Sequence, residues 1–432
     1  MKTIKSFCRP GNIKYFDTDI EVLVPSEYKE KDVETRAVWV STVANIDIPR
    51  ISSVEQYKEY LSSIIATVKE YNMNTVVFQV RPTNDALYES ELAPWSKFIT
   101  GEQGKYPGFD VFGYFMEEAK KANVAVHAWI NPYRVSGDKL DELNMTKEEY
   151  VQTLAPNNFA RLHPDHVIET SLHKLILDPA SDLVKEYISD VCVEIATKYD
   201  VKALHIDDYF YPYEPIADKD EDEKFKKSGF EKLSDFRRNN VDLCIELIHK
   251  KLSKLDRKVE FGISPFAIHR THINKFENKD DEAAWIDGSN NHASCFSGYK
   301  SLYADVIKWM EEGWIDYVIP QDYFDMENIV IDKEGNEKCQ VRYADVVMWW
   351  SKMAAKTNVK LYIGQAIYRY SEEGSWSNPE EIPNQLLYNQ MFDNVLGTCF
   401  FTYHDFTRDR NKALVEGRKL LKKMWTKPAQ EI

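Results

Sequence analysis

Two adjacent carboxylates, Asp207 and Asp208, are the part of the sequence best suited to acid–base chemistry. They follow a short apolar segment, residues 203–206, and precede the aromatic turn YFYPY. Burial beside a second carboxylate raises the pKa of a carboxyl group, whereas a nearby arginine lowers it. Cleavage of a glycosidic bond uses such a difference, because one carboxylic acid protonates the leaving oxygen while a carboxylate acts as base or nucleophile. The pair therefore predicts glycoside hydrolysis, and the alternative is an aspartate that only caps a strand–helix junction.

The second catalytic carboxylate is expected at a distance from this pair. We expect Asp322 to supply it, because this residue follows the sixth predicted strand, across the mouth of the fold from the fourth. Successive strand residues point to opposite faces, so only one member of the adjacent pair is expected to point into that mouth. A carboxyl separation of about 5 Å predicts retention and one of about 6.5 to 9.5 Å predicts inversion, and the sequence does not choose between them. The alternatives to Asp322 are Asp85, Asp405 and Glu214.

Further hydrogen-bonding and aromatic side chains follow most of the predicted strands. Arginine suits the recognition of carboxylates, amides suit hydroxyl groups, and aromatic rings stack on sugar faces. Side chains at the carboxyl ends of parallel strands meet at one edge of a sheet, so their convergence is typical of a binding site. We therefore expect a substrate-binding set of Trp39, Arg81, Asn84, Asp85, Asn131, Tyr133, Arg134, Tyr209, Tyr211, Gln321, Gln365 and Asp405.

Histidines and phosphate-binding motifs give little support to other chemistries. His163 and His166 lie in an irregular segment without a third ligand nearby, so we predict no metal site and no cofactor. His205, inside the fourth predicted strand, is expected to be a hydrogen-bonded core residue. The sequence has no P-loop and no G-x-S-x-G turn.

The elements that must position these residues alternate between strands and helices. Short apolar runs fall at residues 37–40, 75–80, 124–130, 203–206, 259–263, 317–320, 361–364 and 397–401, and each precedes a stretch of helical periodicity. Eight strands, each followed by a helix, predict an α/β fold, a single (β/α)₈ TIM barrel with long βα-loop insertions. A doubly wound open sheet is the alternative, disfavoured because no glycine-rich turn follows the first strand. Active sites of such barrels lie at the carboxyl ends of the strands.

Length and composition fit one large domain. We expect an N-terminal extension over residues 1–33, the barrel over 34–426 and a tail over 427–432. The chain has 432 residues, of which 43% are hydrophobic, and a net charge of −15, which disfavours nucleic acid as a partner. Six scattered cysteines predict free thiols. No apolar run spans a membrane and no signal peptide is seen, so a cytoplasmic location is expected, or an extracellular or periplasmic one if a signal has been trimmed. The oligomeric state stays open.

Several blocks of sequence are similar to those of a known family. QVRPTNDALY, HAWINPYR, HIDDYFYPY, FGISPF and LYIGQAIY resemble the glycosyl hydrolase-like family 10, and the resemblance spans about residues 34–424. It implies a (β/α)₈ barrel of a bacterial glycosidase that acts on cell-wall glycan strands freed of their peptide stems. It also implies Asp207 and Asp208 as the acidic centre. The residues that it implies at the mouth are Arg81, Asn84, Asp85, Asn131, Arg134, Gln321 and Gln365.

The chain departs from the family pattern at two places. His269 stands where a tryptophan is expected, so one sugar-stacking ring is absent there. Asp322 stands where the family has an apolar residue, so the resemblance gives it no inherited role. Family members are commonly exported or lipid-anchored, and this sequence shows neither signal.

The hypothesis that follows is a glycoside hydrolase acting on an oligo- or polysaccharide by a two-carboxylate mechanism. Two hypotheses from other classes stay open. A carbohydrate-binding barrel without catalysis would keep the rings and amides but need no paired acids. A metal-dependent hydrolase or deacetylase would use aspartate and histidine at the mouth.

Overall fold

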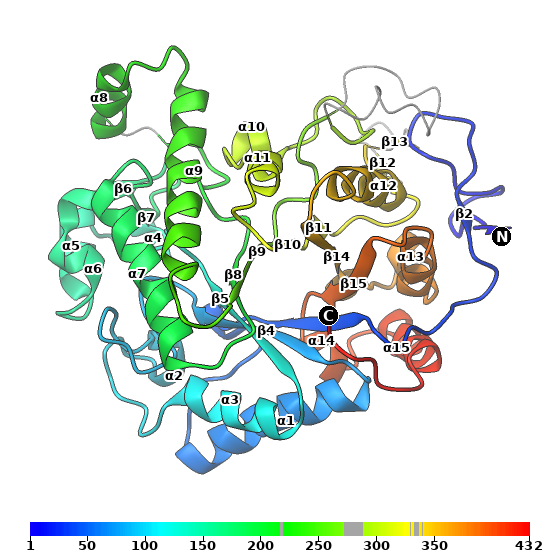
Figure 1. Cartoon of the computed structure of the whole chain (residues 1–432), viewed down its shortest axis with the longest axis horizontal. Coiled ribbons are helices and arrows are strands. Elements are labelled where there is room, and N and C mark those ends of the chain that lie inside the picture. Colours follow the sequence, from blue (N-terminus) through cyan, green and yellow to red (C-terminus); the bar gives the residue numbers. More distant parts are fainter. Residues whose placement is uncertain (217–218, 272–287, 329, 332–336, 339) are drawn as a thin grey trace.

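A computed structural model shows parallel strands closed into a barrel and surrounded by helices (Figure 1). The structure describes residues 1–216, 219–271, 288–328, 330–331, 337–338 and 340–432. The barrel closes because β10 pairs with both β9 and β14. The predicted (β/α)₈ fold is therefore confirmed. Its strands are β3 (Thr35–Val40), β4 (Thr75–Arg81), β5 (Ala125–Ile130), β8 (Ala203–Ile206), β9 (Glu260–Ile263), β10 (Tyr317–Val318) continued by β11 (Gln321–Asp322), β14 (Lys360–Gln365) and β15 (Val395–Phe400).

The sixth strand is divided where the sequence predicted one run. Pro320 lies between β10 and β11 and has no backbone N–H to donate to a neighbouring strand. β11 nevertheless continues the pairing with β14, Gln321 opposite Gly364 and Asp322 opposite Gln365.

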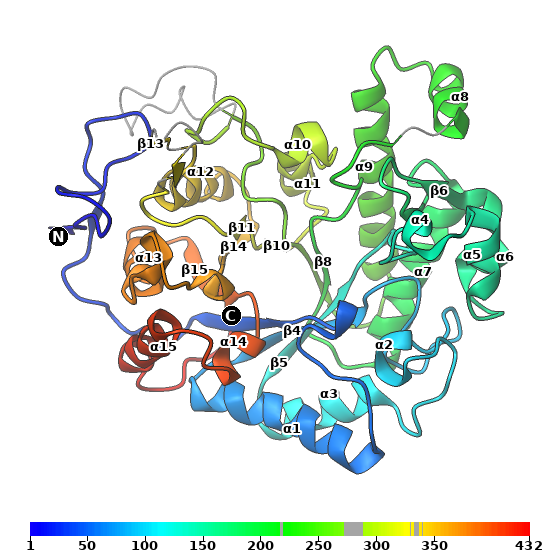
Figure 2. The ribbon, with the colours of Figure 1, turned by 180° about the vertical axis from the view of Figure 1, so that it is seen from behind.

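Amphipathic helices cover the outside of the barrel, as Figure 2 shows from behind. Several begin at a side-chain cap that the sequence supplies: the Ser53 hydroxyl accepts from the N–H of Gln56, and Ser181 accepts from Val184. The surrounding helices are α1 (Val54–Glu70), α3 (Val111–Lys121), α7 (Asp182–Lys198), α9 (Leu233–Leu252), α11 (Val306–Glu311), α12 (Tyr343–Ala354), α13 (Glu381–Asn389) and α15 (Lys412–Met424).

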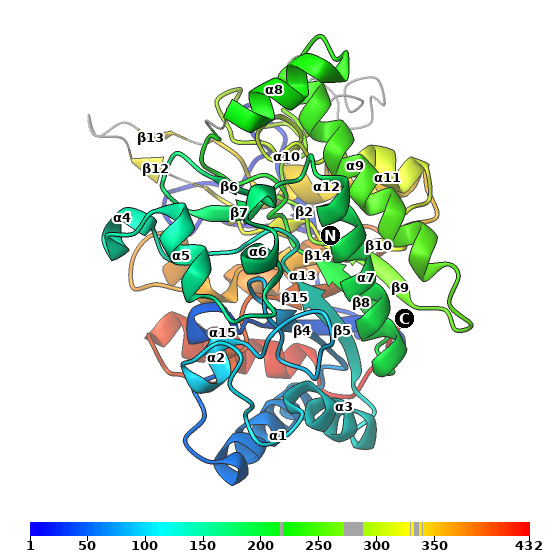
Figure 3. The same ribbon diagram turned by 90° about the vertical axis from the view of Figure 1, so that its left-hand side faces the viewer.

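Long insertions follow several strands, as predicted. Figure 3 shows α4, α5, β12 and β13 on the side of the barrel away from the C-terminus. The insertion after β5 also holds an antiparallel pair, β6 with β7. The inserted elements are α2 (Lys97–Thr100), α4 (Leu140–Leu143), α5 (Lys147–Thr153), α6 (Phe159–Leu162), β6 (Val167–Glu169), β7 (Leu175–Leu177), α8 (Lys219–Ser228), α10 (Gly298–Ser301), β12 (Val330–Ile331), β13 (Glu337–Lys338) and α14 (His404–Thr407).

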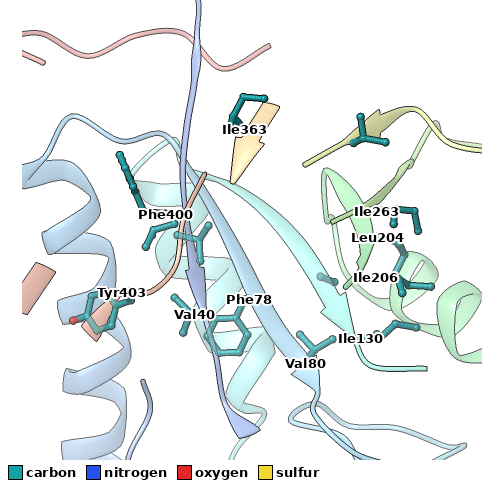
Figure 4. Packing of buried hydrophobic residues seen from close by; sticks show 14 of the residues in the cluster. Val40, Phe78, Val80, Ile130, Leu204, Ile206, Ile263, Ile363, Phe400 and Tyr403 are labelled. Atoms are coloured by element: carbon teal, nitrogen blue, oxygen red, sulfur yellow. The ribbon is translucent and has the colours of Figure 1, made fainter. Parts of the chain in front are cut away.

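Side chains of the barrel strands alternate between two apolar layers. The outer layer packs the strands against the helices, and Figure 4 shows Val40, Phe78, Ile206 and Phe400 within it. The inner layer fills the barrel with Ala37, Trp39, Val77, Trp129, Ala203, Tyr317, Ile319, Tyr362 and Cys399.

Glycine makes room for the largest rings of the inner layer. A Cβ on Gly262 would lie 2.1 Å from the ring of Tyr317, and one on Gly364 would lie 2.9 Å from the ring of Trp39. Two glycine positions thus allow aromatic side chains to cross the barrel interior.

The segments outside the barrel pack against it. The N-terminal segment, which contains β1 (Lys2–Thr3) and β2 (Leu23–Val24), runs beside α12 and α13 (Figures 1 and 2). The Tyr15 hydroxyl lies 3.1 Å from that of Tyr388, and the N–H of Phe16 donates to Asp345. At the C-terminal end, Gln430 pairs with Val33. The proposed division at residues 33 and 426 stays a prediction.

The structure also bears on two expectations from the sequence, which concern membrane-spanning segments and the cysteines. Among the described residues, no helix combines the length and apolarity that crossing a membrane requires. Cys8, Cys192, Cys244 and Cys399 carry free thiols, and Cys339 lies outside the described residues.

Candidate active site

A cavity of about 320 Å³ opens at the carboxyl ends of the barrel strands. Barrels of this kind place their active sites at this end. Its lining mixes aromatic rings with a few polar groups, which is typical of a small-molecule site. The residues are Trp39, Ser41, Val43, Ile46, Gln79, Trp129, Arg134, Asp207, Asp208, Tyr209, Tyr213, Ser264, Gln321, Tyr323 and Phe401.

Both members of the aspartate pair line this cavity, so the expectation that only one would do so is wrong. The reason is local. Strand β8 ends at Ile206, and the pair belongs to a turn in which the N–H of Phe210 donates to the Asp208 carbonyl at 3.0 Å. The alternation of a pleated strand does not extend into a turn.

Asp207 is surrounded by hydrogen-bond donors. Its Oδ2 accepts from Trp129 Nε1 and its Oδ1 from the N–H of Tyr209, both at 3.1 Å. The amide of Asn131 lies 3.4 Å from both oxygens. Burial raises the pKa of Asp207, while the charge of Arg134 and these donors act in the opposite direction. The donors favour the ionised form.

Asp208 has a different environment. Its Oδ1 accepts from Gln321 Nε2 at 3.1 Å, and its Oδ2 is hydrogen-bonded to the hydroxyl of Tyr213. Burial and the negative charge of Asp207 raise the pKa of Asp208 to about 7. Asp208 is therefore the member of the pair better suited to hold a proton near neutral pH.

A neutral hydrogen-bonded chain lies beneath the pair. His205 Nε2 lies 2.9 Å from Ser264 Oγ and 3.4 Å from Trp39 Nε1, and its Nδ1 lies 3.0 Å from the Tyr317 hydroxyl. That hydroxyl lies 2.9 Å from Nδ1 of His127. Burial lowers the pKa of both imidazoles, that of His127 to about 3. His205 is thus a hydrogen-bonded core residue, as predicted, and it brings no charge to the floor of the cavity.

Aromatic rings form the other walls. The ring of Trp39 meets that of Tyr323 edge-on, with centroids 6.4 Å apart, and Phe401 lies 6.1 Å from Trp39. At the rim, Tyr209 and Tyr213 are each 41% exposed, and the guanidinium of Arg134 stands 4.5 Å over the Tyr209 ring. Exposed rings at a rim suit contact with the flat faces of sugars.

Comparison with known proteins identifies the family. Residues 34–379 match the sequence model of glycosyl hydrolase-like 10. The chain belongs to the glycosyl hydrolase-like 10 family. It is 35% identical over 389 residues to glycosyl hydrolase YngK of Bacillus subtilis (strain 168), covering 88% of this chain and 70% of that protein. Identity to glycosyl hydrolase DigH of Escherichia coli (strain K12) is 30% over 399 residues, covering 87% of this chain and 84% of that protein.

Membership in glycosyl hydrolase-like 10 confirms the resemblance and the assignment of the chain as a glycoside hydrolase at family level. Solved structures support the fold alone. The glycoside hydrolase domain of PgaB (BpsB) from Bordetella bronchiseptica aligns with a TM-score of 0.51 at 13% identity, covering 90% of this chain and 99% of that one. An alpha-L-fucosidase from Paenibacillus thiaminolyticus aligns with a TM-score of 0.50 at 10% identity, over 91% and 50% of the two chains.

In this glycosyl hydrolase-like 10 protein, about half of the expected site residues reach the cavity or the aspartate pair. Asn131 is not in the lining but contacts Asp207. The roles of all these residues stay predictions. Those in the lining are Asp207, Asp208, Trp39, Arg134, Tyr209 and Gln321.

Arg81 and its neighbours lie behind the wall instead of in it. The register of β4 shifts between Gln79 and Arg81, and it is Gln79 that lines the cavity. Arg81 is fully buried and donates to the carbonyl of Asn131 and to Asn84, each at 2.6 Å. Asn84 donates onward to Asn158 in the insertion. Asp85 is also fully buried, and it accepts from the N–H of Lys97.

Asp322 does not reach the cavity either. The order of strands around the barrel puts β10 and β11 two strands from β8, and β15 stands opposite β8. The expectation that Asp322 faces the pair across the mouth is therefore wrong. Its side chain is fully buried on the other side of the wall, and burial, together with the charges of Asp345 and Asp325, raises its pKa well above the usual range.

The remaining expected residues have other partners. Tyr133 and Tyr211 are buried away from the lining, and Tyr211 packs edge-on against Tyr303. Gln365 donates to Gln385 at 3.0 Å, and Asp405 forms an ion pair with Arg410. The alternative acid, Glu214, accepts from Thr170 and lines a neighbouring cavity.

The sequence analysis missed Gln79, Trp129, Tyr213 and Phe401. A signal for the first two exists, because alternation along β4 and β5 puts Val77 with Gln79, and His127 with Trp129, on the inner face. Tyr213 belongs to the aromatic turn that the sequence analysis had noted. The same alternation places Phe401 on the inner face, two residues after Cys399 in the predicted strand.

The described residues contain no cluster of three or more His, Cys, Asp and Glu side chains that could hold a metal ion. The two histidines considered for this role have other surroundings. His166 Nδ1 lies 2.6 Å from the hydroxyl of Ser181, and the ring of His163 packs against Phe159.

Proposed function

We propose that this protein hydrolyses O-glycosidic bonds of an oligo- or polysaccharide in the cavity above Asp207 and Asp208. The observation that carries the proposal is the unequal environment of the two carboxyl groups. Asp208 is the group able to hold a proton near neutral pH, and Asp207 is held as an acceptor by its donors. A proton donor for the leaving oxygen beside an ionised carboxylate is what glycoside cleavage requires.

Peptide-free glycan strands of the bacterial cell wall are the substrate that we propose. The family resemblance supports this choice, and the aromatic rim of Tyr209 and Tyr213 suits a chain of sugar rings. Arg134 stands at the same rim. Its guanidinium suits an acidic substituent such as a carboxylate on the glycan.

The test is hydrolysis of a glycan panel by the wild-type protein, Asp208→Asn and Asp322→Asn. The panel holds peptide-free cell-wall glycan strands, chitin oligosaccharides and cellulose oligosaccharides. Loss of a general acid typically lowers kcat by about 10²- to 10⁴-fold, so Asp208→Asn is expected to lose that much. Asp322→Asn is the matched control and keeps its rate, because its carboxyl group does not face the cavity.

Two results would contradict the proposal. Unchanged turnover by Asp208→Asn on every active substrate would remove Asp208 from the reaction. Calorimetric binding of a glycan by the wild-type protein without any product after long incubation would favour the carbohydrate-binding barrel.

A further inference from the structure

The acids that the described residues bring to the cavity lie on one side of it. Among the described residues, Asp207 and Asp208 are the carboxylates of its lining. A glycosidase that uses a carboxylate as nucleophile, or as base for water, needs two carboxyl groups that flank the sugar, about 5 to 9.5 Å apart depending on the outcome. Adjacent residues in one turn approach the sugar from the same wall. Within the described part of the chain, the site therefore has a proton donor but no carboxylate that faces it across the cavity.

The opposite wall is apolar. Strand β15 stands across the barrel from β8, and Phe401 follows it into the cavity beside Trp39 and Tyr323. Two acids on that side, Asp405 and Asp47, lie outside the lining. Asp405 is held by Arg410, and Asp47 accepts hydrogen bonds from Thr402 and from the N–H groups of Ser41 and His404. Trp39 and Phe401 carry no nucleophilic group, and burial raises the pKa of the Tyr323 hydroxyl well above its usual range, which disfavours its nucleophilic phenolate form. The three rings offer a small apolar surface beside the pair.

We propose that the nucleophile is supplied by the substrate, as the carbonyl oxygen of a 2-acetamido group on the sugar whose bond is cleaved. Asp207 accepts a hydrogen bond from the acetamido N–H, and Asp208 protonates the leaving oxygen. This inference rests on the proposed glycoside hydrolysis and restricts it to N-acetylated amino sugars at the cleavage point.

The surroundings of Asp207 fit an acceptor with one position left for substrate. A carboxylate can accept about four hydrogen bonds. Trp129 and Tyr209 occupy one position on each oxygen, and Asn131 lies at the longer distance of 3.4 Å. Donors on fixed strands and turns also hold the carboxylate in place, which an acceptor that must orient an amide requires.

The surroundings of Asp208 fit a group that changes its protonation state. The hydroxyl of Tyr213 can donate to the carboxylate or accept from the carboxylic acid, so it serves both forms. Gln321 donates to the other oxygen. The partners of Asp207 thus favour its ionised form, whereas those of Asp208 accommodate both forms.

The aromatic wall fits the acetamido methyl group. The indole N–H of Trp129 donates to Asp207, so the ring of Trp129 adjoins the carboxylate that would hold the acetamido N–H. Trp39 and Tyr323 line the same cavity, Trp39 buried and Tyr323 partly buried. A methyl group held between such rings leaves water, which is favourable.

The reaction balances without a further reactant. In the first step the acetamido oxygen forms a bond to C1, the bond from C1 to the leaving oxygen breaks, and the proton of Asp208 passes to that oxygen. The intermediate is a bicyclic oxazolinium ion, whose N–H is held by Asp207. In the second step water attacks C1 and gives a proton to Asp208. The bond between C1 and the acetamido oxygen breaks. The product sugar keeps its anomeric configuration.

The experiment compares peptide-free cell-wall glycan strands with the same strands after chemical N-deacetylation and re-acylation with trifluoroacetyl groups. The wild-type protein is expected to lose at least about 10³-fold in kcat/KM on the trifluoroacetylated strands, because the fluorine atoms withdraw electrons from the carbonyl oxygen. Full re-acetylation, the matched control, restores the rate. The first-formed product, followed by NMR, is expected to retain the anomeric configuration.

Asp207→Ala with added azide tests whether the nucleophile is the acetamido oxygen of the substrate or Asp207 itself. If Asp207 were itself the nucleophile, azide would replace it, restore the rate and give a glycosyl azide. We expect no rescue and no such product.

The outcomes distinguish this inference from the proposed function. Hydrolysis of acetylated and trifluoroacetylated strands at equal rates, inversion of configuration, or azide rescue would each overturn the inference and leave glycoside hydrolysis standing. Failure of the wild-type protein to cleave any glycan would overturn both.

Discussion

Two groups of buried acids lie on either side of β11, and their pKa values are raised for the same reason. Asp207 and Asp208 face the cavity. Behind the wall, among α12, α13 and the N-terminal segment, burial raises the pKa of Asp345 to about 7 and that of Glu381 to about 8. A perturbed pKa is therefore no sufficient sign of catalysis, since structural groups show it too.

The two groups of acids differ in the partners that surround their carboxyl oxygens. Glu381 accepts from the N–H of Met326 at 2.8 Å and from Gln385 at 2.9 Å, and Asp345 accepts from the N–H of Phe16. These partners join the N-terminal segment and the loop after β11 to the helices. The cavity pair has open space on one side instead. The first group stabilises loops, and the second is available to a ligand.

The largest expected effect is on the stability of the protein, and it comes from Glu381, one of the acids behind the wall. The folded pKa of Glu381 lies above its unfolded value, so the folded state keeps a proton that the unfolded state loses. This contribution is complete below about pH 4.5 and is lost as the pH rises to about 8. Glu381→Gln is therefore expected to flatten the fall in stability between pH 5 and 8 by a few kcal/mol.

Denaturant unfolding at several pH values checks this expectation, with the exposed neighbour Glu380→Gln as the control. If Glu381→Gln lowers glycan turnover by more than its loss of folded protein explains, the acids behind the wall are not purely structural.

The next effect is on the pH dependence of activity, and it comes from the cavity pair, Asp207 and Asp208. Because Asp208 must be protonated to act as an acid, kcat/KM is expected to fall about tenfold per pH unit above about pH 7. In Asp207→Asn the negative charge that raises the pKa of Asp208 is gone, so the decline of the residual activity is expected to begin at lower pH. Initial rates between pH 5 and 9 measure both. A decline at the same pH in both proteins would assign it to another group.

The smallest effect concerns the hydroxyl that contacts Asp208. The hydrogen bond from Tyr213 lowers the pKa of Asp208, so Tyr213→Phe is expected to move the alkaline decline to higher pH and to reduce kcat by less than about tenfold. Tyr211→Phe is the matched control, because that ring belongs to the same turn but lies outside the cavity. An identical pH profile in wild type and Tyr213→Phe would mean that this contact does not form in solution.

The strands and their order were predictable because burial on both faces imposes apolar runs. The Asp207–Asp208 pair was predictable as part of the site because it directly follows such a run. The break at Pro320 divides the sixth strand without changing its place in the barrel.

The direction of individual side chains was not predictable to the same degree. A position after a strand shows which end of the barrel a residue occupies, but not whether it points inward. Arg81 and Gln79 illustrate this, since the register shift in β4 turns the arginine behind the wall and leaves the amide in the cavity. Asp322 illustrates a second limit, because a charged group close to it behind the wall, Asp345 of α12, is distant in sequence.

The pairing of Gln430 with Val33 has a practical consequence. The N–H of Glu34 donates to the carbonyl of Gln430 at 2.9 Å, and Asn74 donates to Ala429 at 3.1 Å, so this segment crosses the amino ends of β3 and β4. A linker attached after Ile432 would leave from the base of the barrel. Protein immobilised on a bead or sensor chip through that linker would turn its open mouth toward the solution, where long polymers can approach it unhindered.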